Sequence, residues 1–423
     1  MTEAEEKMPE GQNAARTVEE IIANTNIADI YRACKQLDGV VRRTKLIESE
    51  YFSELAENTV LIKPENLQKT GSFKLRGAYN RISQLTKEQK DKGIITASAG
   101  NHAQGVAYAA RELGVHAVIC MPATTPILKV EATRAYGVEV VLHGDTFDDA
   151  AAKAQELTAE HGYIYIHPFN DLEVLLGQGT TAMEIVDECK DADCILVPIG
   201  GGGFASGVAL ATKSLNPNIF VYGVEPEGAP CMDASFKAGK AVSLESVDTV
   251  ADGCAVKTPG NLTFAFCRKY LDGIITVSEM EIMSALLSLI EKHKLIAEGA
   301  GVLSLAALTK LPFKHKKVVA IVSGGNIDIS TISALIDKAI IARGREFCFS
   351  VPLPDKPGQL LAIASILARL NANVIHLDHN QAMVTDSFKK VMLGVTVETN
   401  GPEHIQRIVE AMKAEGYDIT KVY

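Results

Sequence analysis

The feature that most limits the fold of this chain is an alternation of short apolar runs with helical stretches between about residues 60 and 345. The β-branched run GIITAS at 93–98 predicts a strand, and GVAYAARELG at 105–114 has the spacing of an amphipathic helix. The same order returns with HAVICM at 116–121 and ILKVEATRAYG at 127–137. Such alternation requires crossover connections, so we predict an α/β fold of open, mostly parallel sheets flanked by helices.

Three glycine-containing turns directly follow predicted strands. They are SAGNH at 98–102, PIGGGGF at 198–204 and SGGN at 323–326. In open parallel sheets, ligands bind at the carboxyl ends of the strands. We therefore expect the three turns to contribute to one binding site.

Four consecutive glycines, Gly200, Gly201, Gly202 and Gly203, stand between a predicted strand and a predicted helix. Such a turn can point backbone N–H groups at an anion, and the N-terminus of the following helix adds partial positive charge. A phosphate group is the expected ligand, and the alternative is a tight turn that binds nothing. The run lacks the Walker ending and the dinucleotide pattern, which favours a phosphorylated cofactor other than a nucleotide.

The other two turns carry polar side chains that suit a ligand. Asn101 and His102 open the helix after the first turn, where asparagine is also an ordinary N-cap, so capping alone stays open. Ser323, at the end of its strand, can hydrogen-bond a ring nitrogen or an oxygen, although this signal is weak by itself.

One lysine has unusual neighbours. Lys74 lies in KTGSFKLRGAYN, among small and polar residues, with Arg76 two positions later. Burial and nearby positive charge lower the pKa of a lysine and make its amine a nucleophile. A nucleophilic lysine together with a phosphate-binding turn indicates a Schiff base with pyridoxal phosphate. The alternative is a surface lysine at the start of a helix.

Composition excludes several other classes of protein. The net charge of −10 over 423 residues argues against nucleic-acid or anionic-membrane partners, which require a basic surface. The eight cysteines form no CxxC pair, which indicates buried thiols in a reducing compartment and no metal site. No apolar run reaches the length of about 18 residues that a membrane span needs. We expect a soluble, cytoplasmic protein.

The pattern changes near residue 346, and three segments follow from it. We predict a polar, disordered leader over 1–25, a catalytic domain over 26–345 with a smaller subdomain at about 67–165, and a separate domain over 346–423. In this last domain the order of predicted elements is β-α-β-β-α-β, which indicates a ferredoxin-like fold.

Taken together, SFKLRGA, SAGNHAQG, GGGG and SGGN, in this order, resemble the pyridoxal-phosphate-dependent fold type II family and, within it, the threonine dehydratases (threonine ammonia-lyases). HPFND at 167–171 and GQGT at 177–180 resemble the same family. The resemblance covers about residues 25–345. The last domain resembles an ACT domain, in which DKPGQL at 355–360 matches the first β-to-α turn.

The resemblance implies a role for each matching residue. Lys74 would form the Schiff base, and Phe73 would pack beside the cofactor ring. Asn101 would bind the ring hydroxyl, and Ser323 the ring nitrogen. The phosphate would be held by Gly200, Gly201, Gly202, Gly203 and the amide of Phe204, and the substrate carboxylate by the segment of Ser98, Ala99, Gly100 and His102.

The implied reaction is the conversion of L-threonine to 2-oxobutanoate and ammonia, with L-serine as a second substrate. Serine racemases share the fold, but they carry a serine where this chain has Ala99, which has no proton to exchange. A catalytically dead amino-acid sensor is the non-enzymatic alternative. Some relatives bind a cation near EPEGAPC at 225–231, but Cys231 stands where they have an acidic ligand, which argues against a divalent site. A monovalent ion held by backbone carbonyls stays open, and we favour an ordinary loop before a helix.

An ACT domain implies an amino-acid effector, bound near 355–358 and 371–377 at an interface between subunits. It also implies a homo-oligomer, either a dimer or a tetramer. A plain oligomerisation role without a ligand stays open, as do the identity of the effector and the choice between isoleucine biosynthesis and a degradative role.

Overall fold

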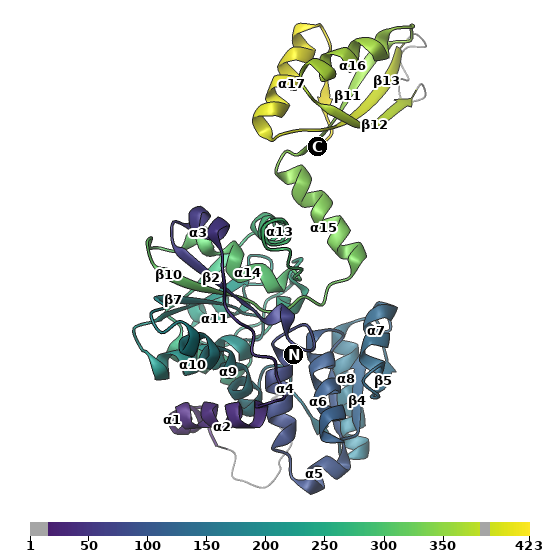
Figure 1. Ribbon diagram of the computed structural model, residues 1–423. Helices are drawn as coiled ribbons and strands as arrows, with labels where there is room; N and C mark the ends of the chain where they lie inside the picture. The colour runs from purple at the N-terminus through teal and green to yellow at the C-terminus, as the bar shows by residue number, and fades with distance from the viewer. Residues whose placement is uncertain (1–15, 381–389) are drawn as a thin grey trace. The chain divides into compact units, whose positions relative to one another are not determined.

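A computed structural model of the protein describes residues 16–380 and 390–423. The chain divides into two compact units, of which the first ends at Ile327 and the second begins at Asp328 (Figure 1). Most of the leader predicted over 1–25 lies outside the described residues. In the described part, no helix is long and apolar enough to cross a membrane.

The larger sheet of the first unit has the strand order β1-β2-β10-β7-β8-β9, and every neighbouring pair except β1–β2 is parallel. The mostly parallel sheet predicted from the alternation is thus confirmed. Its central strand β10 is buried along nearly its whole length because helices cover both faces. The strands are β1 (Ile47–Glu48), β2 (Thr59–Pro64), β7 (Cys194–Pro198), β8 (Phe220–Pro226), β9 (Gly273–Val277) and β10 (Lys317–Val322).

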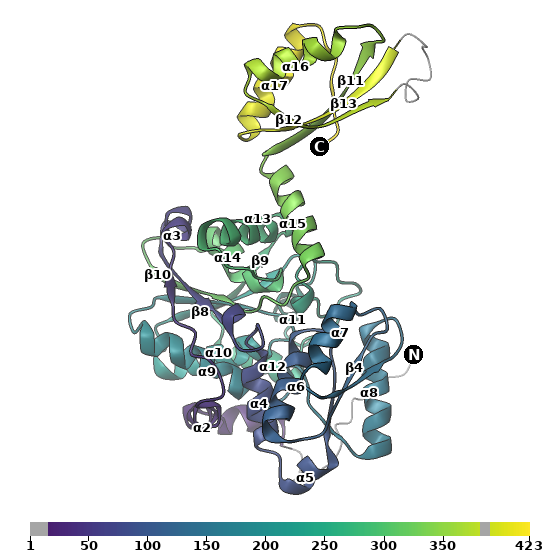
Figure 2. The ribbon, with the colours of Figure 1, turned by 45° about the vertical axis from the view of Figure 1, so that its right-hand side comes forward.

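Helices form a layer on each face of this sheet (Figures 1 and 2). One layer contains α2 (Ile27–Leu37), α9 (Leu172–Glu188), α10 (Gly203–Leu215) and α12 (Asn261–Tyr270), and the other contains α3 (Glu50–Ala56), α13 (Glu279–Ser288) and α14 (Leu303–Ala306). Helices α9 and α10 touch through glycines, because a Cβ atom on Gly207 would lie 2.0 Å from the carbonyl oxygen of Leu175. This close approach brings the start of α10 next to the site described below.

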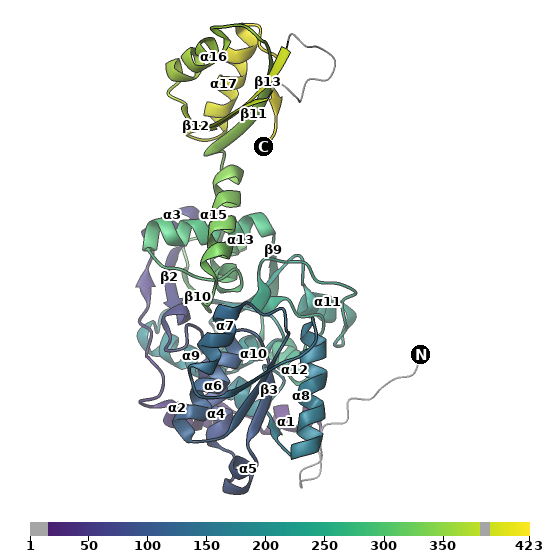
Figure 3. The ribbon, with the colours of Figure 1, turned by 90° about the vertical axis from the view of Figure 1, so that its right-hand side faces the viewer.

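The smaller sheet is inserted between β2 and β7, has the order β5-β4-β3-β6 and is parallel throughout. Its strands are β3 (Ile94–Ala97), β4 (Ala117–Met121), β5 (Glu139–Leu142) and β6 (Ile164–Tyr165). Side chains alternate across it: Ile94 packs with α4 (Lys74–Ser83) and α6 (Asn101–Leu113), whereas Ile95 packs with α8 (Phe147–His161). Figure 3 shows the sheet between these two layers, with α5 (Lys87–Lys92) and α7 (Ile127–Arg134) at its margins.

Helix α1 (Val18–Asn24) corrects the expectation of a leader that continues to residue 25. Thr17 and Glu20 form a capping box, in which each side chain accepts the backbone N–H of the other residue. Ile21 and Ile22 then pack on the core of the larger sheet, so the partial burial of two apolar side chains holds an otherwise polar segment in place.

The second unit contains α15 (Ile329–Ala342), β11 (Glu346–Pro354), α16 (Gln359–Arg369), β12 (Asn373–Asn380), β13 (Lys390–Glu398), α17 (Pro402–Ala414) and β14 (Thr420–Lys421). From β11 onward this is the predicted β-α-β-β-α-β order, folded as an antiparallel sheet β12-β13-β11-β14. Phe347, Phe349 and Val351 alternate along β11 and point into its core. The unit starts at 328 and not at 346, because α15 contacts β11 and belongs with it.

Candidate functional site

The three predicted turns meet at one end of the sheets. SAGNH follows β3, the glycine run follows β7, and SGGN follows β10. Asn101, from the smaller sheet, accepts a hydrogen bond of 2.7 Å from Asn326 at the end of β10. The carbonyl of Ser323 accepts the backbone N–H of Phe73 at 3.1 Å, which attaches the Lys74 segment to the same place.

The glycine run has the geometry of an anion cradle. Cβ atoms on Gly201 and Gly203 would lie 2.3 Å from the ring of Phe169 and 2.8 Å from its carbonyl oxygen. Gly202 has a φ of +90°, which favours glycine, and it directly precedes α10, whose N-terminus has no side-chain cap. The first N–H groups of a thirteen-residue helix are therefore left for a ligand, as a phosphate requires.

Lys74 is the first residue of α4, and little of its surface is exposed. The amino nitrogen donates a hydrogen bond of 2.9 Å to the carbonyl oxygen of Pro168. Burial lowers the pKa of Lys74 to about 8, while Cys254 and Glu298 act in the opposite direction. A substantial fraction of the amine is thus neutral near physiological pH, as a nucleophile or a base must be.

Phe73 and Phe204 form a stacked pair whose ring centroids are 3.8 Å apart with an angle of 8° between the ring planes. One ring precedes Lys74 and the other follows the glycine run. The contact therefore links the lysine to the cradle across more than a hundred residues of sequence. Phe73 thus lies against Phe204, and its packing beside a cofactor ring stays a prediction.

Glu298 is a site residue that sequence reasoning missed. Asn101 donates a hydrogen bond of 2.5 Å to its Oε1 atom, and a Cβ atom on Gly324 would lie 2.3 Å from the same oxygen. Burial raises the pKa of Glu298 to about 7. The signal that identified Lys74 was also present here, because Glu298 is a single charge in the small, apolar run IAEGAGV.

Ser323 and the SAGNH turn complete the site. The buried Ser323 hydroxyl donates to the carbonyl oxygen of Ala300 at 3.3 Å. Ser98 Oγ accepts the N–H of Gly100, and a Cβ atom on Gly100 would meet nothing within 4 Å, so this turn borders open space. His102 instead points away from the turn, with Nε2 3.0 Å from the carbonyl oxygen of Ile166, and burial lowers its pKa to about 3.

The loop at 225–231 has a structural explanation. Glu225 accepts the backbone N–H groups of Met232 and Asp233, each at 2.8 Å, in the first turn of α11 (Cys231–Ala238). Its carboxylate is thus used to hold the start of a helix. Across residues 16–380 and 390–423, no group of three or more His, Cys, Asp or Glu side chains is arranged to hold a metal ion.

A family model described as pyridoxal-phosphate dependent enzyme matches residues 37–324. The chain belongs to this family. Its solved members include threonine deaminase isoform 2 from Solanum lycopersicum, with a TM-score of 0.72 and 40% identity over 79% of this chain and 91% of that one. Maize serine racemase gives a TM-score of 0.71 and 35% identity over 75% of this chain and 98% of its own. The first unit thus has the fold type II architecture, as predicted.

Curated relatives match along most of the chain. L-threonine ammonia-lyase of Thermotoga maritima is 44% identical over 93% of this chain and 98% of its own length. The catabolic L-threonine dehydratase TdcB of Escherichia coli is 46% identical over 73% of this chain and 95% of its own length. The biosynthetic L-threonine dehydratase IlvA of Pasteurella multocida is 40% identical over 90% of this chain and 74% of its own length.

The residues of the site fit the cofactor of the family. An uncapped helix start behind a glycine run suits a phosphate, and a buried lysine of lowered pKa suits a carbonyl partner. The amide of Asn101 and the hydroxyl of Ser323 add polar groups that can hydrogen-bond an aromatic ring at its edge.

Proposed function

We propose that this protein converts L-threonine to 2-oxobutanoate and ammonia, and L-serine to pyruvate and ammonia as a second activity. The observation that carries the proposal is the buried amine of Lys74 beside an uncapped glycine-rich helix start. The relatives named L-threonine ammonia-lyase, which match more than nine-tenths of the chain, support threonine as the substrate.

Lys74 would hold the cofactor covalently, with Phe73 beside its ring. Asn101 would bind the ring hydroxyl and Ser323 the ring nitrogen. The phosphate would lie on the cradle formed by Gly200, Gly201, Gly202, Gly203 and the amide of Phe204. Bound in this way, pyridoxal phosphate supplies an electron sink that stabilises negative charge at the α-carbon of an amino acid.

The substrate carboxylate would be bound by the turn of Ser98, Ala99 and Gly100, next to His102. This turn borders open space and offers backbone N–H groups at the start of α6. The imidazole of His102 lies 3.0 Å from the carbonyl oxygen of Ile166, so its role would be to hold the turn in place. Positioning of this kind lowers the barrier by orienting the reacting bond.

Lys74 would also accept the α-proton of the substrate. With the cofactor in place, the amine of Lys74 would act as the general base for this step. Its pKa of about 8 keeps part of it neutral at physiological pH, so it can accept a proton there. Loss of the β-hydroxyl as water, followed by hydrolysis, gives the 2-oxo acid and ammonia, so that one water is lost and one regained.

The alternative reaction for this fold is serine racemisation, because maize serine racemase is a structural relative. Racemisation requires a second acid–base group on the opposite side of the α-carbon. Ala99 carries none, which favours elimination. The deciding experiment incubates the protein with L-serine and with L-threonine and measures D-serine, pyruvate and 2-oxobutanoate.

We expect 2-oxobutanoate and pyruvate without D-serine. A Lys74→Ala variant should lose both products together with the visible absorbance of the bound cofactor. D-serine as the main product would refute the assignment. A protein that binds the cofactor but turns over no amino acid would favour the sensor alternative.

We also propose that the second unit is an ACT domain that binds an amino-acid effector in a cytoplasmic homo-oligomer, a dimer or a tetramer. Its β-α-β-β-α-β order supports this, as does Gly358, whose φ of +93° forms a tight turn before α16. Strand β12 lies at the edge of its sheet with Ile375 and Leu377 exposed, a surface that a second copy could cover. Titrating isoleucine and valine against threonine turnover tests this, and a rate unmoved by any amino acid would remove the regulatory role.

A further inference from the structure

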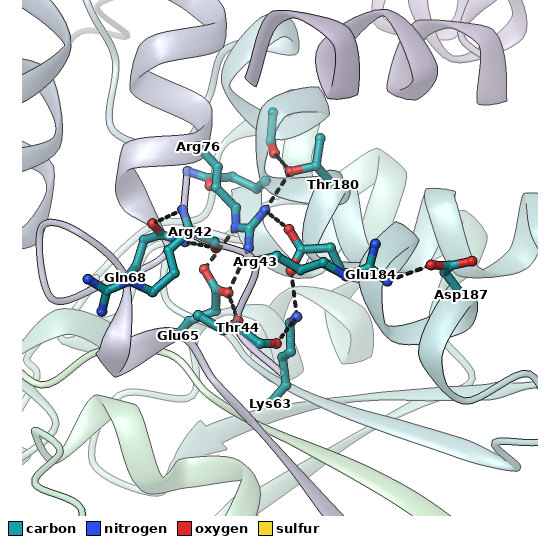
Figure 4. A network of polar contacts seen from close by, with 12 residues as sticks. Arg42, Arg43, Thr44, Lys63, Glu65, Gln68, Arg76, Thr180, Glu184 and Asp187 are labelled. Atoms are coloured by element: carbon teal, nitrogen blue, oxygen red, sulfur yellow. Dashed lines mark hydrogen bonds and ion pairs between the residues drawn. The ribbon is translucent and has the colours of Figure 1, made fainter. Parts of the chain in front are cut away.

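A network of buried charges surrounds Arg76, which follows Lys74 by two positions in α4 (Figure 4). Arg76 donates two hydrogen bonds of 2.8 Å to the carboxylate of Glu65 and one of 2.7 Å to Oε1 of Glu184. The other oxygen of Glu184 accepts a hydrogen bond of 2.6 Å from Lys63. Thr180 adds a further contact of 3.2 Å to Arg76.

The network is electrically balanced, because two cations, Arg76 and Lys63, face two carboxylates, Glu65 and Glu184. Arg76, Lys63 and Glu65 have no exposed surface, and Glu184 is nearly buried. The four residues come from α4, β2, the short turn after β2 and α9. The network therefore ties the start of α4 to a strand of the larger sheet and to a neighbouring helix.

Lys74 and Arg76 occupy opposite sides of the same helical turn. Two positions correspond to a rotation of about 200° around a helix axis. The lysine accordingly reaches the carbonyl of Pro168, while the arginine reaches the network. Helix α4 begins at Lys74 without a side-chain cap and without an acidic residue in its first turn. Two cations there oppose the helix dipole, so this turn depends on partners outside the helix.

We propose that Arg76 is a positioning residue that fixes the first turn of α4 and thereby the amino nitrogen of Lys74. Reactive groups must be held within about 0.5 Å of their working geometry. The network restricts this turn because hydrogen bonds hold the guanidinium of Arg76 from two sides, to Glu65 on one side and to Glu184 of α9 on the other. This inference rests on the proposed covalent link between Lys74 and pyridoxal phosphate.

Arg81 provides a matched control on the same helix. It also pairs with a carboxylate at the start of α9, since its Nε atom lies 2.8 Å from Asp171. It lies about two turns from Lys74, whereas Arg76 lies about half a turn away, and it is partly exposed. Loss of helix-to-helix attachment alone should therefore affect variants at both positions, whereas misplacement of Lys74 should affect only variants at Arg76.

The experiment compares Arg76→Lys and Arg76→Gln with Arg81→Lys and Arg81→Gln. Cofactor-free protein is mixed with pyridoxal phosphate, reduced with borohydride, and Lys74 attachment is measured by peptide mass spectrometry over a pH series. In the Arg76 variants we expect capture at pH 7 to be slower by at least about tenfold, with its pH midpoint raised by at least one unit. The Arg81 variants should stay within twofold of the parent protein. Arg76 variants that fold and capture the cofactor as the parent does would overturn the inference.

A charge-balanced double variant covers the case in which single Arg76 variants do not fold. Arg76→Met with Glu65→Leu removes one cation and one carboxylate and keeps the pair of Lys63 and Glu184. The double variant should fold, as judged by circular dichroism, and still capture the cofactor slowly; capture at the parent rate would refute the positioning role. If pyridoxal phosphate does not attach to Lys74 in the parent protein, the proposed function fails. If it attaches there, and the Arg76 variants capture it at the parent rate, only the positioning role of Arg76 is refuted.

Discussion

Replacing Lys74 by methionine should make the cofactor-free protein more stable while removing its activity. In the folded protein burial lowers the pKa of Lys74 from 10.5 to about 8. Below pH 8 the amine is protonated in both the folded and the unfolded chain, so the folded state bears the whole cost of a buried charge. The difference between the two pKa values corresponds to about 3 kcal/mol. Methionine has a similar shape and carries no charge, so it relieves this cost.

The effect has a defined pH dependence. Between pH 8 and 10.5 the unfolded chain binds more protons at this position than the folded chain, so the stability of the parent protein rises with pH. Above 10.5 the amine is neutral in both states and the cost disappears. The advantage of Lys74→Met should therefore fall from about 3 kcal/mol at pH 7 to less than about 1 kcal/mol at pH 10.

Urea denaturation of the cofactor-free proteins at pH 7 and pH 10 measures both values. Lys87→Met is the matched control, since Lys87 also begins a helix, α5, but is exposed. It should change stability by less than about 0.5 kcal/mol at either pH. A Lys74→Met protein no more stable than its parent at pH 7, or an advantage equal at both pH values, would refute the reasoning.

Three further predictions follow from single contacts. Gly207→Ala places a methyl group 2.0 Å from the carbonyl oxygen of Leu175 and should lower the denaturation midpoint strongly, whereas Gly100→Ala, with open space around its Cβ, should leave the midpoint unchanged. Burial raises the pKa of Glu298 to about 7, so the neutral carboxyl contributes stability that is fully present below pH 4.5 and is lost as the pH rises through 7. Glu298→Gln cannot ionise, so the difference in its free energy of unfolding between pH 5 and pH 8 should be smaller than in the parent protein. The imidazole of His102 should stay neutral at pH 5, because burial lowers its pKa to about 3, and a charged ring seen by NMR at that pH would contradict its burial.

Lys74 and Glu298 illustrate how far sequence reasoning extends into the site. Each is a charged residue among small neighbours, and Lys74 stands out because a glycine run elsewhere indicates a phosphorylated partner. Glu298 had no such companion in the sequence, since its partner Asn101 lies 197 positions away. A pattern confined to neighbours cannot report a contact of that range.

Helices α1 and α15 also show that local sequence patterns do not report long-range contacts. The β-α-β-β-α-β order after residue 346 was visible because alternation along strands such as β11 is local. Helix α1 was not, since its sequence is mostly polar and it depends on packing the partly buried Ile21 and Ile22 against the core of the larger sheet. Helix α15 was assigned to the first domain for a similar reason, because its contact with β11 cannot be read from its own residues.

By itself, the sequence determined the fold class, the strand ends at which the glycine turns lie, and the oddity of Lys74 in KTGSFKLRGAYN. These follow from periodicity and from the backbone freedom of glycine, which are properties of short stretches. Only the tertiary structure decided that Phe73 stacks on Phe204 and that Arg76 turns away from the site toward Glu65 and Glu184. The contacts of buried side chains depend on how sheets and helices pack. The hydrogen bonds of Arg76 next to Lys74 are therefore visible only in the tertiary structure.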